Sequence, residues 1–215
     1  MLTKCTSAAV FGIDAYLVEV EVDVHPGESR PVVVGLPDAA VRESVDRVKT
    51  AMINSRYTWP FTMAVLINLA PADTRKEGPA FDLPMALGII RSSGQIDGDE
   101  QFDNFAAVGE LALDGSLRPV KGVLSMAIEC RKQGLQGLVV PYENRNEAAI
   151  AEGLDVIPVR TLSDAVGFFS GDKPIGPHRV DVAALFERDG TYEVDYIDVK
   201  GQSHAKRAMV VAAAG

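Results

Sequence analysis

Hydrophobic and acidic residues alternate most regularly between Tyr16 and Val24, where four valines are separated by Glu19, Glu21 and Asp23. This period of two predicts a strand with one buried face. Turn-forming residues occupy 25–29, and 31–35 has the pattern of a second strand, so the sequence predicts a hairpin of these two strands. Residues 62–69 alternate in the same way and predict a further strand.

Other stretches carry hydrophobic residues three and four positions apart, which predicts helices. The first runs from Pro37, which suits a first helical turn, to about Asn54. Asn144 with Glu147 and Thr161 with Asp164 each have the spacing of a capping box before a helix. The remaining predicted elements are helices over 81–90 and 122–133 and strands over 106–113, 117–120, 137–140 and 155–158.

The order of these elements predicts the fold class. Strands and helices alternate without the rhythm of an all-parallel sheet, so we expect an α+β fold built of mixed α/β layers. The pattern breaks down over 170–192, and the last fifteen or so residues are again helical. The sequence thus predicts a domain over 1–170, a linker over 171–194 and the start of a second module over 195–215.

Charge narrows the range of partners. The chain has 215 residues and a formal net charge of −9, from 30 acidic and 21 basic residues, which argues against a surface built mainly for nucleic acid. Arg42, Arg47 and Lys49 share the first helix and could contact DNA. Glu43 and Asp46 lie between them, so a solvated helix face is the preferred interpretation.

The cysteine count and the hydrophobic runs bear on location. Cys5 and Cys130 are too few and too far apart for a disulfide framework, which favours a reducing compartment. No apolar run reaches the roughly 20 residues that cross a bilayer, and the first ten residues do not resemble a signal peptide. We therefore expect a cytoplasmic protein without a membrane partner.

The loop within 70–87 is the candidate for chemistry. Nucleophilic catalysis needs an activated Ser, Thr, Cys or Lys, and the loop offers Thr74 and Lys76 among Asp73 and Glu77. After Gly78-Pro79, where a turn would present a nucleophile at a helix start, the next residue is Ala80, whose methyl group cannot attack a substrate. The simpler interpretation is a charged, solvated surface loop.

A metal site is not favoured by the residue spacing. The three histidines, His25, His178 and His204, are scattered and have no second ligand at a usual spacing. Asp73, Glu77 and Asp82 could in principle bind a hard cation, but a solvated acidic cluster is the preferred interpretation. We expect no metal ligands.

Three motifs together resemble the proteolytic domain of Lon proteases, whose fold resembles the second domain of ribosomal protein S5. They are residues 76–80 (Lys-Glu-Gly-Pro-Ala), 109–124 and 134–144, the last ending in Pro-Tyr-Glu-Asn, within a resemblance that covers about 15–170. The resemblance places the catalytic Ser of that family at Ala80 and its partner Lys at Leu124, so both members of the dyad are missing. A relocated dyad of Lys121 and Ser125, four residues apart on one helix face, is a less favoured alternative.

The end of the chain resembles a class of proteins other than the Lon proteases. Residues 198–202 (Asp-Val-Lys-Gly-Gln), followed by 205–208 (Ala-Lys-Arg-Ala), are similar to the opening of the ATPase module of magnesium-chelatase-like AAA+ proteins. That resemblance places Ile197, Val199 and Gly201 near adenine in the full-length protein. The chain contains no Gly-x-x-x-x-Gly-Lys-Ser/Thr loop for the phosphates.

A degenerate Lon-like domain followed by such an ATPase resembles the YifB/ComM family, as does the stretch 35–44. The resemblance implies that the full-length parent is a hexameric motor that uses ATP and Mg²⁺ and acts on DNA, as a helicase for branch migration in recombination or natural transformation. The chain would be its N-terminal part, cut before the phosphate-binding loop, with no enzymatic activity and no cofactor of its own. The alternatives are a divergent Lon-like peptidase and a scaffold of a magnesium chelatase-type complex.

Overall fold

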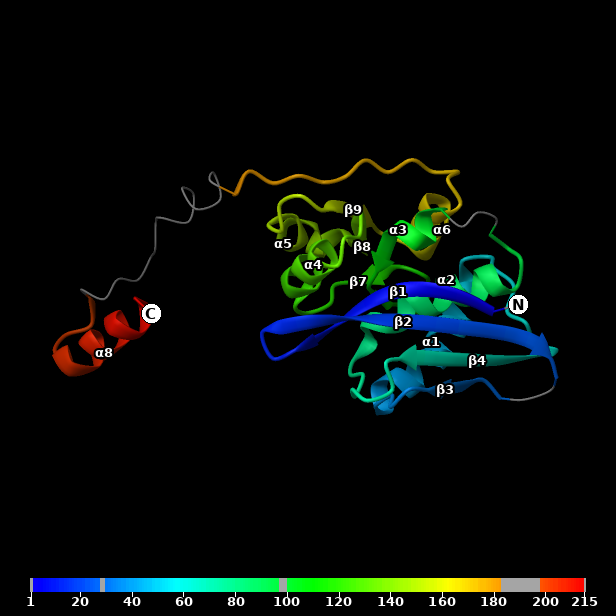
Figure 1. Ribbon diagram of the computed structural model, residues 1–215, viewed down its shortest axis with the longest axis horizontal. Coiled ribbons are helices and arrows are strands. Elements are labelled where there is room, and N and C mark those ends of the chain that lie inside the picture. The colour runs from blue at the N-terminus through cyan, green and yellow to red at the C-terminus, as the bar shows by residue number, and fades with distance from the viewer. Residues whose placement is uncertain (1, 28–29, 97–99, 183–197, 215) are drawn as a thin grey trace. The chain divides into compact units, whose positions relative to one another are not determined.

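We describe a computed structural model of residues 2–27, 30–96, 100–182 and 198–214. The described residues divide into a compact unit that extends to Val180 and a second unit that begins at Asp181. The first unit is a mixed sheet between two layers of helices (Figure 1). The predicted α+β fold is confirmed.

The described part of the chain contains a seven-stranded sheet in the order β3-β4-β2-β1-β5-β8-β9. Its first half is a meander, in which β1 is antiparallel to β2 and β2 is antiparallel to β4. Its second half is parallel, since β5, β8 and β9 run alongside one another. The strands are β1 (Leu2–Phe11), β2 (Asp14–Pro26), β3 (Val32–Val34), β4 (Met63–Ala70), β5 (Phe105–Ala107), β8 (Gly137–Pro141) and β9 (Asp155–Val159).

The alternation that predicted β2 buries Val18, Val20, Val22 and Val24 on one face, as expected. The predicted hairpin is wrong, because β3 pairs in parallel with β4 and β2 forms its hairpin with β1. Ten residue pairs join β1 to β2 and eight join β2 to β4, so both edges of β2 are occupied and the three-residue β3 pairs with the far edge of β4.

One layer of helices covers the first hydrophobic cluster of the sheet. Its members are α1 (Ala39–Asn54), α2 (Asp82–Ser92) and α6 (Leu162–Phe169), joined by the short α3 (Glu100–Asn104). The second cluster lies under α4 (Val123–Lys132) and α5 (Arg145–Ala149). The short antiparallel pair β6 (Glu110–Leu111) and β7 (Leu117–Arg118) confirms the predicted turn between 106–113 and 117–120.

Two predicted capping boxes have different outcomes. The box of Thr161 and Asp164 at α6 is confirmed, with reciprocal hydrogen bonds. The box at Asn144 is wrong, because the Asn144 side chain makes no capping bond to α5. Its amide instead pairs with both backbone groups of Val120, at 2.9 Å each. The same local spacing therefore serves a long-range contact.

Residues 171–180, which the sequence assigns to the linker, pack on the first unit. The His178 N–H donates to the Val156 carbonyl at 2.8 Å, and Lys173 Nζ contacts Asp164 at 2.5 Å. In the second unit, the predicted C-terminal helix is α8 (Ser203–Ala213), which buries none of its residues within the described structure. None of the described helices is both long and apolar enough to cross a membrane.

Candidate functional site

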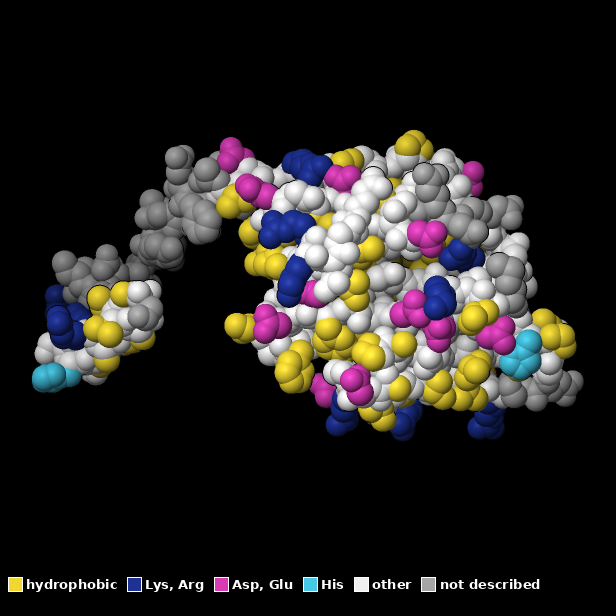
Figure 2. All heavy atoms as spheres, viewed as in Figure 1, with side chains coloured by type: hydrophobic (Ala, Val, Ile, Leu, Met, Phe, Trp, Pro, Cys, Tyr) yellow, Lys and Arg dark blue, Asp and Glu magenta, His cyan; other side chains and the backbone are white. Residues whose placement is uncertain are grey.

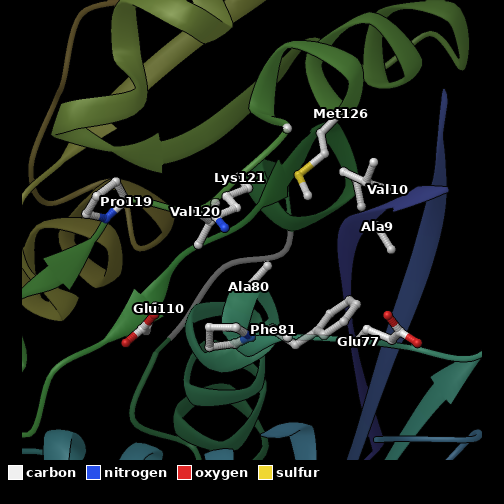
Figure 3. A pocket seen from close by; sticks show the side chains of 14 residues that line it. Ala9, Val10, Glu77, Ala80, Phe81, Glu110, Pro119, Val120, Lys121 and Met126 are labelled. Carbon is white, nitrogen blue, oxygen red and sulfur yellow. The ribbon is translucent and has the colours of Figure 1, made fainter. Parts of the chain in front are cut away.

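A cavity of about 530 Å³ lies where the sheet and the loop before α2 meet. Its floor is the short 3-10 helix η1 (Pro79–Phe81), and its roof is the segment 119–122 with the side chain of Met126. One wall is the end of β1, from Ala8 to Val10 (Figure 3). This volume lies within the range of ordinary ligand pockets, about 300–1,000 Å³.

The loop that forms the floor is attached to the start of α1. Its backbone pairs with 36–38, where the Asp38 N–H donates to the Lys76 carbonyl at 3.0 Å and the Lys76 N–H donates to the Leu36 carbonyl at 3.2 Å. Asp38 also caps α1 by accepting from Val41 N and accepts from Gly78 N at 3.3 Å. One carboxylate thus fixes both a helix start and the turn before η1.

Lys76 is not solvated, contrary to the prediction for this loop. Its side chain is fully buried, with 0% exposure, and Nζ donates to the Thr74 carbonyl at 2.8 Å. Burial lowers the pKa of Lys76, and the nearby Asp73 opposes this shift. Lys76 does not line the cavity, so its amine is a structural group of the loop.

The first turn of α2 is held by a buried carboxylate. Asp82 has 0% exposure, and it accepts from Arg47 Nε at 3.0 Å, Arg47 Nη2 at 3.2 Å and Leu111 N at 3.1 Å. Burial raises the pKa of Asp82, and the Arg47 guanidinium opposes that rise. The sequence predicted a solvated helix face for Arg47 and a solvated cluster for Asp82, and both interpretations are wrong because the two side chains pair and Asp82 is buried. The DNA contact that the sequence also offered for Arg47 stays a prediction.

Ala80 lies at the centre of the cavity floor, and the residue is 8% exposed. The Ala80 carbonyl accepts from Gly109 N at 2.9 Å, and the Gly109 carbonyl accepts from Leu83 N at 3.1 Å. These two bonds lock the start of α2 to the strand segment beside it. The position that the resemblance assigns to a nucleophile is therefore rigidly presented, but it carries no reactive atom.

Leu124 is partly buried against the second cluster and does not line the cavity. Lys121 does line it, and Figure 3 shows the Lys121 side chain extending in the direction of Ala80. The less favoured alternative, a relocated dyad of Lys121 and Ser125 on one helix face, finds no support. Helix α4 begins only at Val123, and the Ser125 hydroxyl donates to the Ile13 carbonyl at 2.8 Å. Lys121 thus faces a methyl group.

The described residues do not form a metal centre. They contain no cluster of three or more His, Cys, Asp and Glu side chains that could hold an ion. His25 contacts Asp23 and His178 contacts Asn146, while His204 is exposed on α8. Asp73 and Glu77 lie on the exposed part of the loop, as predicted.

The predicted adenine-proximal residues lie in the second unit. Ile197 falls outside the described residues. Val199 and Gly201 are exposed, and Lys206 Nζ donates to the Val199 carbonyl at 2.5 Å. The described part of this unit has no buried residue that could enclose a nucleotide, so these residues alone do not fit ATP.

Comparison with known proteins places this architecture in a family. Residues 20–144, more than half of the chain, match the family model described as subunit ChlI of Mg-chelatase. Competence protein ComM of Haemophilus influenzae is 38% identical over 97% of this chain and 41% of its own length. The protein YifB of Escherichia coli is 36% identical over 96% of this chain and 40% of its own length. The chain thus spans about two fifths of these relatives.

A more distant similarity supports the resemblance to Lon. Lon protease 2 of Bacillus subtilis is 25% identical over 177 residues, which cover 74% of this chain and 31% of that protease. The family match, and the similarity to ComM and YifB over nearly the whole chain, agree with the resemblance drawn from residues 35–44 and 76–80. The chain belongs to the magnesium-chelatase ChlI family and is a homologue of ComM and YifB.

Proposed function

We propose that this chain is the N-terminal, non-catalytic part of a magnesium-chelatase-like AAA+ ATPase. One observation carries the proposal: Ala80 lines the cavity at the position that the resemblance to Lon assigns to the nucleophile, and its methyl group cannot act as one. A cavity without a reacting group at that position is suited to binding or positioning. Its role in the parent protein is assembly or substrate guidance.

The parent protein is a hexameric motor that binds ATP with Mg²⁺ and acts on branched DNA as a helicase in recombination or natural transformation. Support comes from the 38% identity to a protein named for competence and from the ATPase-like tail at 198–208. Residues Ile197, Val199 and Gly201 would contact adenine only when the rest of the ATPase module encloses them. DNA would be bound by the assembled ring, because this chain is acidic.

The proposed roles are assigned to the predicted domains. The degenerate Lon-like domain comprises 1–170, the connecting segment 171–194 is packed on that domain as far as Val180, and 195–215 begin the ATPase module. The motor works in the cytoplasm, where ATP and DNA are both present.

The sequence that follows Gly215 in the gene gives a first test. A Gly-x-x-x-x-Gly-Lys-Ser/Thr motif within about 30 residues supports the motor, because this loop holds the β and γ phosphates. Its absence would remove the basis for ATP hydrolysis. The full-length protein is then assayed for ATP turnover, with the Lys of that motif changed to Ala as the matched control.

Two alternatives have specific support. The family description favours a scaffold subunit of a magnesium chelatase-type complex, which would hydrolyse ATP without separating DNA strands. Lys121 in the cavity favours a divergent peptidase, in which Lys121 would deprotonate a water molecule that attacks the peptide carbonyl, because the cavity lining offers no Ser, Thr or Cys. Such a peptidase would hydrolyse casein and lose that activity in Lys121→Ala. The first alternative is tested on branched DNA and the second with labelled casein.

A further inference from the structure

The wall of the cavity formed by β1 has an unusual geometry. Ala8, Ala9 and Val10 are consecutive strand residues, and all three line the cavity. Neighbouring side chains of a strand point to opposite faces of the sheet. Three in a row can line one cavity only if that cavity abuts the edge of the strand, where backbone N–H and C=O groups are presented.

The sheet register explains why this edge is open. On one side β1 pairs with β2 along its whole length, from Leu2 to Phe11. On the other side, the register within the described residues joins β1 to β5 only at Thr6 and Ala106. The chain after β5 bonds with Ala80 through Gly109. Beyond Thr6, the cavity lies against Ala8, Ala9 and Val10 of β1.

The lining favours a chain with apolar side chains. Ala80, Phe81, Val120 and Met126 present hydrocarbon to the cavity. The turn after β1 carries two exposed hydrophobic residues, Phe11 at 72% and Ile13 at 90%. Figure 2 shows hydrophobic side chains gathered at this end of the hairpin, next to an acidic one.

Charge selects among such chains, because two carboxylates and one amine, that of Lys121, line the cavity. Figure 3 shows Glu77 and Glu110 on opposite sides of Ala80. Among the described residues, Glu77 forms a long ion pair of 3.5 Å with exposed Arg75, and Glu110 forms one of 3.5 Å with exposed Arg118. Such surface pairs are weak and readily exchanged. The net charge of −9 also attracts cationic partners.

We infer that the cavity binds an extended peptide, which adds to the free edge of β1 and carries apolar side chains flanked by basic residues. Only a polypeptide backbone can pair with strand-edge N–H and C=O groups at their spacing. The peptide is bound and not cleaved, so this inference rests on the proposed non-catalytic role of the cavity. It identifies the class of partner that the domain would guide or recruit.

The test uses the 215-residue chain and a fluorescein-labelled peptide, Arg-Val-Leu-Val-Arg, followed by fluorescence anisotropy. We expect saturable binding that weakens at least about fivefold when the two valine nitrogens are methylated, because two lost backbone hydrogen bonds together cost about 1–3 kcal/mol. A matched peptide, Glu-Val-Leu-Val-Glu, should bind at least about threefold more weakly. The double variant Glu77→Lys/Glu110→Lys should prefer the acidic peptide.

Two readouts that need no variant locate the site and separate the hypotheses. The methyl resonance of Met126 should shift on binding, while that of Met209 on α8 should not. Mass spectrometry should find the peptide intact. An intact peptide without binding, equal binding of the methylated peptide, or an unshifted Met126 signal would overturn the inference alone. Any cleavage of the peptide, whether or not it depends on Ala80, would instead overturn the proposed non-catalytic function.

Discussion

The ion pair of Arg47 and Asp82 makes a quantitative prediction about what holds the site in shape. The two side chains meet at 3.0 Å, with the Asp82 side chain 0% and the Arg47 side chain 26% exposed. Coulomb attraction at this distance is about 5–6 kcal/mol with an effective dielectric constant of about 20. Desolvation offsets part of it, and removing one partner of such a pair typically costs about 3–5 kcal/mol. Because Arg47 is partly exposed, we expect Arg47→Leu to cost about 3 kcal/mol.

The matched control lies on the same helix. Arg42 is exposed on α1, and Arg42→Leu should change the free energy of unfolding by less than about 0.5 kcal/mol. Both variants are compared with the parent chain by urea denaturation, followed by far-UV circular dichroism at pH 7.5. A cost below about 1 kcal/mol for Arg47→Leu would show that Asp82 does not depend on its partner.

The pH dependence of this variant has a definite sign. Burial raises the pKa of folded Asp82 above its unfolded value, and removal of Arg47 would raise it further. Between the unfolded and folded pKa values the folded state holds a proton that the unfolded state has released, so stability falls as pH rises. The loss in free energy of unfolding that Arg47→Leu causes should therefore be smaller near pH 4.5 than at pH 7.5. A deficit that grows on acidification contradicts the assignment.

Three further predictions concern the cavity and its supports. Asn144→Ala should cost about 2–4 kcal/mol in urea denaturation, because it leaves both buried backbone groups of Val120 without partners; a cost within 0.5 kcal/mol would contradict this. Ala80→Ser should remain unlabelled by a fluorophosphonate probe, because Leu124 supplies no base, and labelling would show that Lys121 serves as one. Burial raises the pKa of Asp164, but hydrogen bonds, including one from Lys173, outweigh it and lower the pKa overall. The stabilisation of the fold by the Asp164 carboxylate is therefore present above about pH 4 and should be lost on further acidification. The variant Asp164→Asn should lack this stabilisation.

The elements with regular patterns could be predicted from the sequence. Strands β2 and β4 and helix α1 follow their hydrophobic periods because one face of each meets a single core. Strand β1 was missed, because its small residues from Ser7 to Ala9 are buried on both faces and hide the period of two. The partner of β3 was also wrong, since turn residues signal a reversal but do not say which strand lies alongside.

The candidate site was predicted in its outline and not in its contacts. The motif at 76–80 located the loop and the methyl group of Ala80 at its centre, and the structure places both at the cavity. Burial of Lys76 and the pairing of Asp82 depend on residues 35 or more positions away, which no local pattern reveals. Asn144 shows the same limit, because a capping spacing and a long-range clamp look identical in sequence.

The division of the chain into domains stays a prediction. The first compact unit extends to Val180, where Arg179 contacts the Leu154 carbonyl and Asp155. Composition alone suggested an earlier end, because Gly171 and Pro174 are typical of linkers although this segment packs on β9.

The central proposal is that this chain is the non-catalytic N-terminal part of an ATP-driven motor that acts on branched DNA. The most direct measurement is separation of a labelled four-way DNA junction by the full-length protein, with ATP and Mg²⁺ or with a non-hydrolysable ATP analogue. The account predicts separation with ATP and none with the analogue. ATP hydrolysis that leaves the junction intact under the same conditions would contradict it.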